Sequence, residues 1–137
     1  MKFPTSCLRL SCLLAALSSF SACGLQEDYQ LTLACRGTLE TLSKKAHEPA
    51  GDASREEVRR YDFKLRELEG YACHTWRKDK IACIRSLEDE DTYLHESLTV
   101  HREVMTVEHV ATLEKKRTGL IREENFQGKC TKMEASD

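Results

Sequence analysis

The sequence lacks the short motifs that mark common catalytic and nucleotide-binding sites. It contains no G-x-S-x-G, no P-loop, no G-x-G-x-x-G and no H-E-x-x-H. His95-Glu96 starts like the last of these motifs, but the next histidine, His101, is too far along the chain to share one helical turn with His95. We therefore predict that the protein is not an enzyme, needs no cofactor and has no small-molecule substrate.

The sequence also lacks a strong excess of positive charge and a long apolar segment. Lys and Arg together number 21, against 23 Asp and Glu, whereas nucleic-acid-binding modules usually carry a clear basic excess. This balance argues against a nucleic-acid partner. The longest apolar stretch, Leu10 to Ala16, is well short of the roughly 20 residues that a membrane-spanning helix needs.

The N-terminal region has the layout of an export signal. Lys2 and Arg9 accompany the apolar stretch, and small residues then lead to the sequence Phe20-Ser21-Ala22-Cys23. This end resembles the lipobox of bacterial lipoproteins, in which small residues precede a cysteine that is lipidated and becomes the new N-terminus. The resemblance covers residues 1–23, with Phe20 where the family usually has Leu. It implies a signal peptide over residues 1–22 and an acyl-modified Cys23.

The same resemblance implies where the protein is located. Gly24, rather than Asp, follows the cysteine, which in lipoproteins of diderm bacteria implies sorting to the outer membrane. We therefore expect a lipid-anchored protein of the cell envelope that faces the periplasm. The alternative is an ordinary secretory peptide cut near Ser21 or Ala22, which would leave a secreted or periplasmic soluble protein.

The cysteines support export to an oxidising compartment. Of the seven in the chain, Cys7 and Cys12 lie in the signal peptide and Cys23 is the expected lipid site. The even number that remains predicts two disulfides, formed by Cys35, Cys73, Cys83 and Cys130. No C-x-x-C or C-x-H spacing favours a zinc site.

The pairing of these cysteines is predicted from a hairpin. Residues 70–76 and 80–84 flank the polar turn Arg77-Lys78-Asp79, and a turn centred on Lys78 places Cys73 directly opposite Cys83. Facing positions on paired strands approach the distance that a disulfide requires. Cys35 and Cys130 would then join the first strand to the last, although four cysteines allow three connectivities.

The first strand is the clearest periodic element in the chain. Apolar residues from Tyr29 to Leu39 alternate with polar ones, which is the period of a half-buried strand. Residues 44–57, which contain Pro49 and Gly51-Asp52, are predicted to be a loop.

Residues 54–69 fit two structures. Ser54 and Glu57 make a capping box and apolar residues follow at helical spacing. However, Tyr61, Phe63 and Leu65 also alternate with charged residues. We predict a strand over Arg60 to Glu67 and keep a helix near residues 54–69 as the alternative.

The C-terminal third predicts further strands. Residues 92–102 and 105–113 each alternate, and the parity changes near Val104, which indicates a turn or bulge there. The many Val and Thr residues favour strands over a helix. A turn over residues 115–119 precedes the last strand, Leu120 to Cys130.

Together these patterns predict a mainly β protein, a small antiparallel sandwich or open barrel of about six or seven strands with two disulfides. An α+β fold with the helix near residues 54–69 is the alternative. Residues 23–28 would be a tether, residues 29–132 a single β-rich domain and residues 133–137 a frayed tail.

Three histidines are weak candidates for a metal site. In the strand interpretation His95 and His101 share a face, and His109 would lie across from His101 if the turn centres on Met105. Three convergent imidazoles can bind zinc or copper. The preferred interpretation is a solvent-facing side of the sheet that carries histidines by chance, with no metal.

We therefore expect a non-catalytic, lipid-anchored envelope protein, a binding, inhibitor or immunity-type module for a protein or another envelope component. The sequence does not identify the residues that bind the partner, but this function predicts an exposed apolar or aromatic patch on a sheet face or edge. The alternative function is a periplasmic metal-binding protein that uses the histidines. The acidic run Glu88–Asp91 is interpreted as a solvated loop, and Trp76 as a cover over the Cys73–Cys83 disulfide.

Overall fold

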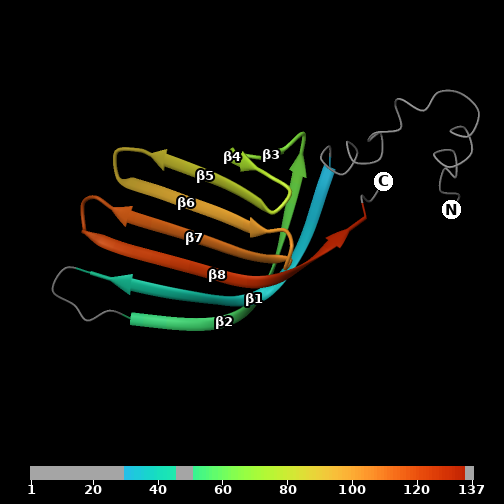
Figure 1. The fold of residues 1–137 in the computed structure, drawn as a ribbon. Helices are drawn as coiled ribbons and strands as arrows, with labels where there is room; N and C mark the ends of the chain where they lie inside the picture. The colour runs from blue at the N-terminus through green and yellow to red at the C-terminus, as the bar shows by residue number, and fades with distance from the viewer. Residues whose placement is uncertain (1–29, 46–50, 135–137) are drawn as a thin grey trace, which may run out of the picture.

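The computed structural model describes residues 30–45 and 51–134, which form a single antiparallel sheet (Figure 1). Its strands are β1 (Gln30–Lys44), β2 (Gly51–Lys64), β3 (Glu67–Leu68), β4 (Ala72–Trp76), β5 (Lys80–Glu88), β6 (Thr92–His101), β7 (Thr106–Lys115) and β8 (Leu120–Met133). In the sheet they follow the order β3-β2-β1-β8-β7-β6-β5-β4. No helix that could cross a membrane is found in these two described ranges.

Several predicted features lie outside the described residues. They are the signal peptide (residues 1–22), the lipidation site Cys23, the tether (residues 23–28) and the last three residues of the tail (residues 135–137).

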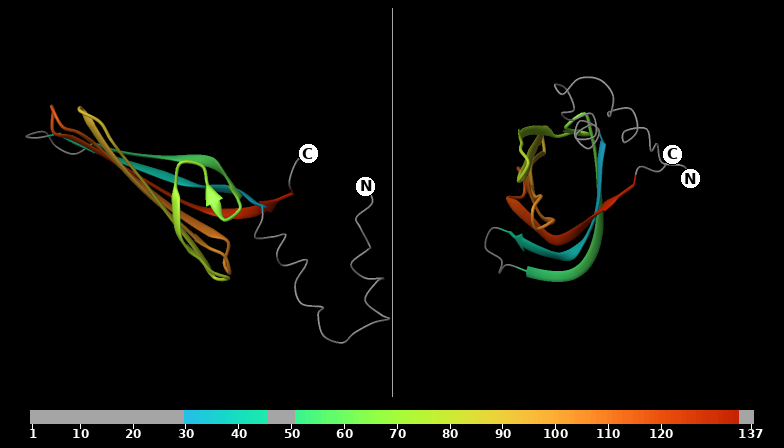
Figure 2. Two further views of the ribbon diagram at one scale, coloured as in Figure 1. Left: turned by 90° about the horizontal axis from the view of Figure 1, so that it is seen from above. Right: turned by 45° about the vertical axis from the view of Figure 1, so that its right-hand side comes forward.

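The sheet is strongly curled, and its two ends approach each other. β3 and β4, the first and last strands in the sheet order, are in contact. Between them, the backbone amide of Tyr71 donates to the carbonyl oxygen of Leu68 (2.9 Å). The sheet is thereby nearly closed into a barrel (Figure 2). The prediction of a mainly β, open-barrel fold is confirmed, and residues 54–69 contain no helix.

A pair of facing glycines accompanies the close approach of β1 and β8. Gly37 lies opposite Gly128 in the register of the two strands, and a Cβ atom on Gly37 would lie 1.8 Å from the backbone oxygen of Gln127. Only glycine fits at such a point, where one backbone presses on another. These glycines allow the two long central strands to pass each other while the sheet curls.

The inner face of the curled sheet carries the core. One residue parity of each strand supplies a cluster of buried side chains, and both disulfides lie within it. Its most fully enclosed members are Phe63, Phe126, Leu33, Leu39, Ile81, Leu98, Val100, Cys35 and Cys83. Trp76 joins this cluster and packs edge-to-face on Phe63, with ring centroids 5.5 Å apart.

Both predicted disulfides are present. Cys35 and Cys130 are cross-strand partners on β1 and β8 with a Cα–Cα distance of 4.0 Å, and Cys73 and Cys83 are partners on β4 and β5 at 3.9 Å. The second pair depends on a detail that the sequence did not reveal. The β4–β5 register shifts between Cys73 and Thr75, so an extra residue in β4 brings Cys73 opposite Cys83.

The predicted loop over residues 44–57 is wrong at both ends. β1 continues to Lys44 and β2 already begins at Gly51, with Ser43 opposite Gly51. The residues of β2 up to Glu56 are polar or small and exposed, so their own pattern gives no strand signal. Pairing with β1 along its whole length holds them in the sheet, a long-range interaction that overrides local propensity.

Candidate functional site

The three candidate histidines do not come together. His95 and His101 lie on the outer face of β6, whereas His109 lies on the inner face of β7 opposite Leu98. The expected pairing of His109 with His101 is wrong because the turn occupies residues 102–105, and His101 pairs with Thr106 instead. Such a change of register moves a side chain to the other face. In the described part of the chain, no three His, Cys, Asp or Glu side chains are grouped to hold a metal ion.

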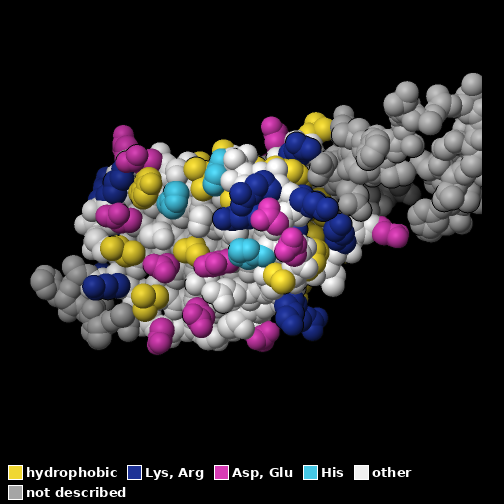
Figure 3. Space-filling model, viewed as in Figure 1, with side chains coloured by type: hydrophobic (Ala, Val, Ile, Leu, Met, Phe, Trp, Pro, Cys, Tyr) yellow, Lys and Arg dark blue, Asp and Glu magenta, His cyan; other side chains and the backbone are white. Residues whose placement is uncertain are grey.

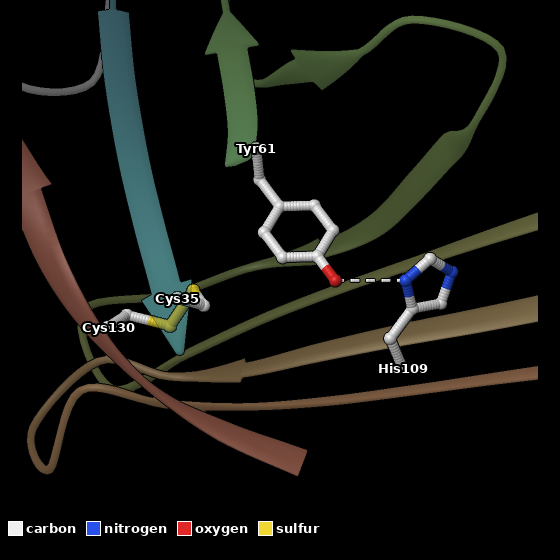
Figure 4. The surroundings of a disulfide bond; sticks show 4 residues. All are labelled: Cys35, Tyr61, His109 and Cys130. Atoms are coloured by element: carbon white, nitrogen blue, oxygen red, sulfur yellow. Dashed lines mark hydrogen bonds between the residues drawn. A yellow bond between two sulfur atoms is a disulfide. The ribbon is translucent and has the colours of Figure 1, made fainter. Parts of the chain in front are cut away.

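His109 is instead the centre of a buried polar cluster on the inner face. The Nδ1 atom lies 2.9 Å from the Tyr61 hydroxyl (Figure 4) and 3.1 Å from a guanidinium nitrogen of Arg59. The Nε2 atom lies 3.2 Å from the Tyr71 hydroxyl and 3.5 Å from the carboxylate of Glu96. Both ring nitrogens are therefore engaged by side chains of the same chain.

The partners of His109 indicate which nitrogen carries the proton. A guanidinium only donates, so Nδ1 accepts from Arg59, and the ring proton lies on Nε2, facing Tyr71 and Glu96. Burial, together with the charge of Arg59, lowers the pKa of His109 despite the opposing charge of Glu96. His109 is therefore neutral at pH 7.

The remaining members of the buried cluster complete its hydrogen bonds. Glu96 is only 7% exposed and forms a close ion pair with Arg85, whose guanidinium also lies over the ring of Tyr71 at 4.8 Å. Burial raises the pKa values of Tyr61 and Tyr71 to about 12, so both hydroxyls stay protonated. Because its charged groups pair with one another, this cluster links β2, β5, β6 and β7 and leaves no charged group for a ligand.

A different site lies on the outer face, where β2, β1 and β8 run side by side at the end of the barrel away from Gln30. It is a surface pocket of about 500 Å3. The register sets Glu40 between Ser54 and Asn125, and Leu42 between Asp52 and Glu123. We call this site the acidic pocket; it is lined by Glu40, Thr41, Leu42, Asp52, Ala53, Ser54, Glu123 and Asn125.

One atom in the acidic pocket lacks the hydrogen bond that its burial requires. The side-chain oxygen of Asn125 is buried and has no partner among the described residues. A buried polar atom without a partner costs about 1–3 kcal/mol. The carboxylates of Glu40, Asp52 and Glu123 accept hydrogen bonds when ionised and cannot donate to it, and the hydroxyls of Thr41 and Ser54, which also line the acidic pocket, make no hydrogen bond to it. The acidic pocket therefore has an excess of acceptors and needs a donor.

The sequence did not single out these residues. Glu40, Asp52 and Glu123 are far apart in the sequence, and only the strand order β2-β1-β8 brings them together. The sequence signal for this site was weak: Glu123 and Asn125 share the outer face of β8, but the same face of β1 carries Glu40 and the apolar Leu42.

The acidic run Glu88–Asp91 lies at the end of β5 and in the turn that leads to β6. The Asp89 carboxylate accepts hydrogen bonds from the backbone amides of Asp91 and Thr92, at 2.8 and 2.7 Å, which lower its pKa. Glu88 pairs with Lys116 (2.6 Å) and Asp91 with Arg117 (2.8 Å). The run thus ties the β5–β6 turn to the β7–β8 turn while staying exposed to solvent.

The expected apolar patch is not found as a continuous surface on the face that Figure 3 displays. Hydrophobic side chains there lie singly among charged ones (Figure 3), as is usual for a protein surface. Among the exposed hydrophobic side chains, Leu42 is 45% exposed and belongs to the acidic pocket.

Comparison of the chain with protein-family models, with curated proteins and with solved structures gave no match. Inferences about the function of this protein therefore rest on its own residues.

Proposed function

We propose that this protein is a non-catalytic, lipid-anchored binding module of the cell envelope whose acidic pocket receives a basic side chain of a partner protein. The unpartnered, buried oxygen of Asn125 is the observation that carries this proposal. An Arg or Lys side chain supplies the donors and the positive charge that the acidic pocket lacks.

The shape and composition of the acidic pocket support a side chain of this kind. Leu42 and Ala53 offer apolar surface for the methylene stem of Arg or Lys, while Glu40, Asp52 and Glu123 surround the charged head. Arg matches carboxylate and amide oxygens with several donors at once and is enriched at protein interfaces. The exposed carboxylates also steer a positively charged partner toward the acidic pocket.

The lipid anchor is proposed from the resemblance of residues 20–23 to a lipobox. It predicts that metabolic labelling with a fatty acid marks the protein, and that Cys23→Ser abolishes the label. A Cys23→Ser protein that still fractionates with membranes after a high-salt wash would contradict the anchor.

The binding role is tested by photocrosslinking in the envelope. A photoreactive amino acid at Leu42 is expected to give an adduct with a second protein, and the same group at Ser97, on the outer face of β6, is expected to give none. Glu123→Lys places a positive charge in the acidic pocket and should abolish the adduct. The control Glu108→Lys makes the same charge reversal at an exposed position outside the acidic pocket, and it should leave the adduct intact.

Two outcomes of this experiment oppose the proposal. An adduct that survives Glu123→Lys shows that the partner does not use the acidic pocket. Absence of any adduct at Leu42 in cells that contain the protein in its native envelope shows that nothing occupies it. Mapping the crosslinked peptide by mass spectrometry should find an Arg or Lys within a few residues of the linked position.

A further inference from the structure

The end of the barrel opposite the acidic pocket is rich in basic residues. Three segments meet there: the β4–β5 turn, the β6–β7 turn and the C-terminal part of β8. We call this surface the basic end; it comprises Arg77, Lys78, Lys80, Arg102, Lys129 and Lys132. The acids among its neighbours, Asp79, Glu103 and Glu134, are fewer, and Asp79 pairs with Arg77 (3.4 Å). Basic side chains gather toward this end in Figure 3.

A pocket of about 190 Å3 opens on the basic end. Leu31, Leu33, Val100 and Met105 line it with apolar surface, and the cationic residues Lys78, Arg102 and Lys132 complete the lining. Leu31, Leu33 and Val100 are at most 6% exposed. An apolar floor beside several cationic side chains suits contact with the anionic headgroups of phospholipids and the methylene groups just below them.

Backbone hydrogen bonds hold the basic end together. The Arg102 amide donates to the Asp79 carbonyl oxygen and the Cys130 amide to the Met105 carbonyl oxygen, both at 2.8 Å. The Arg102 guanidinium donates to the carbonyl oxygen of Arg77 at 3.0 Å and lies 5.7 Å from the centre of the Trp76 ring. The backbone that carries the cationic side chains is therefore held in place, and so is the side chain of Arg102.

The described chain begins at this same end. Gln30 is its first residue, and the adjacent Leu31 lines the pocket. If Cys23 carries the lipid, about seven residues separate the anchor from β1, and an extended chain of that length spans at most about 25 Å. A tether this short keeps the basic end at a high effective concentration near the bilayer surface.

We infer that the basic end docks on the anionic phospholipid surface of the membrane that holds the lipid anchor; this inference rests on the anchor in the proposed function. Docking fixes the orientation of the barrel. Lys132 and Glu123 lie at opposite ends of β8, roughly 30 Å apart along the strand at about 3.3 Å per residue. The acidic pocket is then directed away from the lipid, toward its partner.

Trp76, the only tryptophan in the chain, reports on this docking. The natively purified protein is mixed with vesicles that contain a spin-labelled headgroup quencher, either anionic (phosphatidylglycerol with phosphatidylcholine) or neutral (phosphatidylcholine alone). We expect stronger quenching of Trp76 in the anionic vesicles. The difference should disappear at about 1 M salt, where the screening length falls to about 3 Å.

Charge-reversal variants make the test specific. Each basic residue near an anionic surface strengthens binding about fivefold, so Lys78→Glu combined with Lys132→Glu should lower the docked population at least tenfold. Lys78→Gln with Lys132→Gln should give an intermediate loss, and circular dichroism checks that both variants are folded. The control, Lys44→Glu with Lys115→Glu, makes the same charge change at exposed positions of the far end and should quench like the unmodified protein.

The outcomes separate docking from anchoring. Equal quenching in anionic and neutral vesicles, for a protein that floats with both, overturns the docking inference and leaves the anchor intact. A protein without an acyl group that still binds anionic vesicles through Lys78 and Lys132 supports docking and removes the anchor. If quenching falls in the Lys44→Glu, Lys115→Glu control and not in the Lys78→Glu, Lys132→Glu variant, the assignment of docking to the basic end is overturned.

Discussion

The surroundings of His109 keep its imidazole uncharged. The residue is 7% exposed, and its ring contacts groups from β2 and β6 and the hydroxyl of Tyr71, between β3 and β4. Arg59 and Arg85 are the cationic groups that face this region, Glu96 and the Glu57 carboxylate paired with Arg59 (2.8 Å) are the anionic groups, and both tyrosines stay neutral. The cluster is balanced only while the imidazole carries no proton.

This balance predicts a loss of stability in mild acid. Unfolded, His109 titrates near pH 6.5; folded, its pKa is lower, so the unfolded chain binds more protons between the two values. The free energy of unfolding should therefore fall as the pH drops below about 6.5 and through the folded pKa. Urea unfolding at pH 7, 6 and 5 measures it.

His109→Gln provides the control for this pH dependence. The variant should be less stable at pH 7, by on the order of 1–3 kcal/mol for a disturbed buried hydrogen-bond network, but the slope of stability between pH 7 and 5 should become shallower. An unchanged slope would assign the effect to other groups. Glu57 and Asp62, whose pKa values are lowered by hydrogen bonds from Arg59 and Thr32, contribute only at lower pH.

The surroundings of individual side chains could hardly be predicted from the sequence. The face on which His109 lies depends on the position of the β6–β7 turn, and the predicted register, which differs from the observed one by three residues, placed the side chain on the surface instead of in the core. The Asn125 oxygen is likewise unpartnered only because of what the neighbouring strands present to it.

Among the elements, β1 and β8 shape the molecule through their facing glycines. Gly37→Ala would place a methyl group 1.8 Å from the Gln127 backbone oxygen, which has no freedom to move. We expect a loss of about 3 kcal/mol or more, or failure to fold. Gly51→Ala, at the start of β2 with nothing within 4 Å of the added atom, should change stability by less than about 0.5 kcal/mol. Chemical denaturation compares the two, and similar losses would refute this role for Gly37.

Strand identity was predictable wherever one face of a strand is apolar. β1, β6 and β7 follow from alternation, as does the second half of β2, and the β4–β5 hairpin follows from the polar turn between two apolar segments. The first half of β2 was not predictable, because its residues have no apolar parity and owe their structure to β1. The two-residue strand β3 is too short to show any period.

On the scale of the whole molecule, the two disulfides contribute unequally. Cys35–Cys130 spans 95 residues and Cys73–Cys83 spans 10. In the chain-entropy model the long loop stabilises by about 4–5 kcal/mol and the short one by less than about 3. Replacing Cys35 and Cys130 by Ala should therefore lower the unfolding midpoint in denaturant more than replacing Cys73 and Cys83. Equal losses, measured for both pairs under the same conditions, would contradict this ranking.

The strand order also has a consequence for how the chain matures. β1 lies between β2 and β8 in the sheet. One edge of β1 therefore stays unpaired until β8, the last strand of the sheet in chain order, is available. In an exported chain that is translocated from its N-terminus, Cys35 reaches the oxidising compartment with Cys73 and Cys83 before Cys130 arrives, so a non-native disulfide among these three is the most accessible error. Correct folding of this protein should therefore benefit from an enzyme that reshuffles disulfides, and slow translocation should increase the yield of species with non-native disulfides.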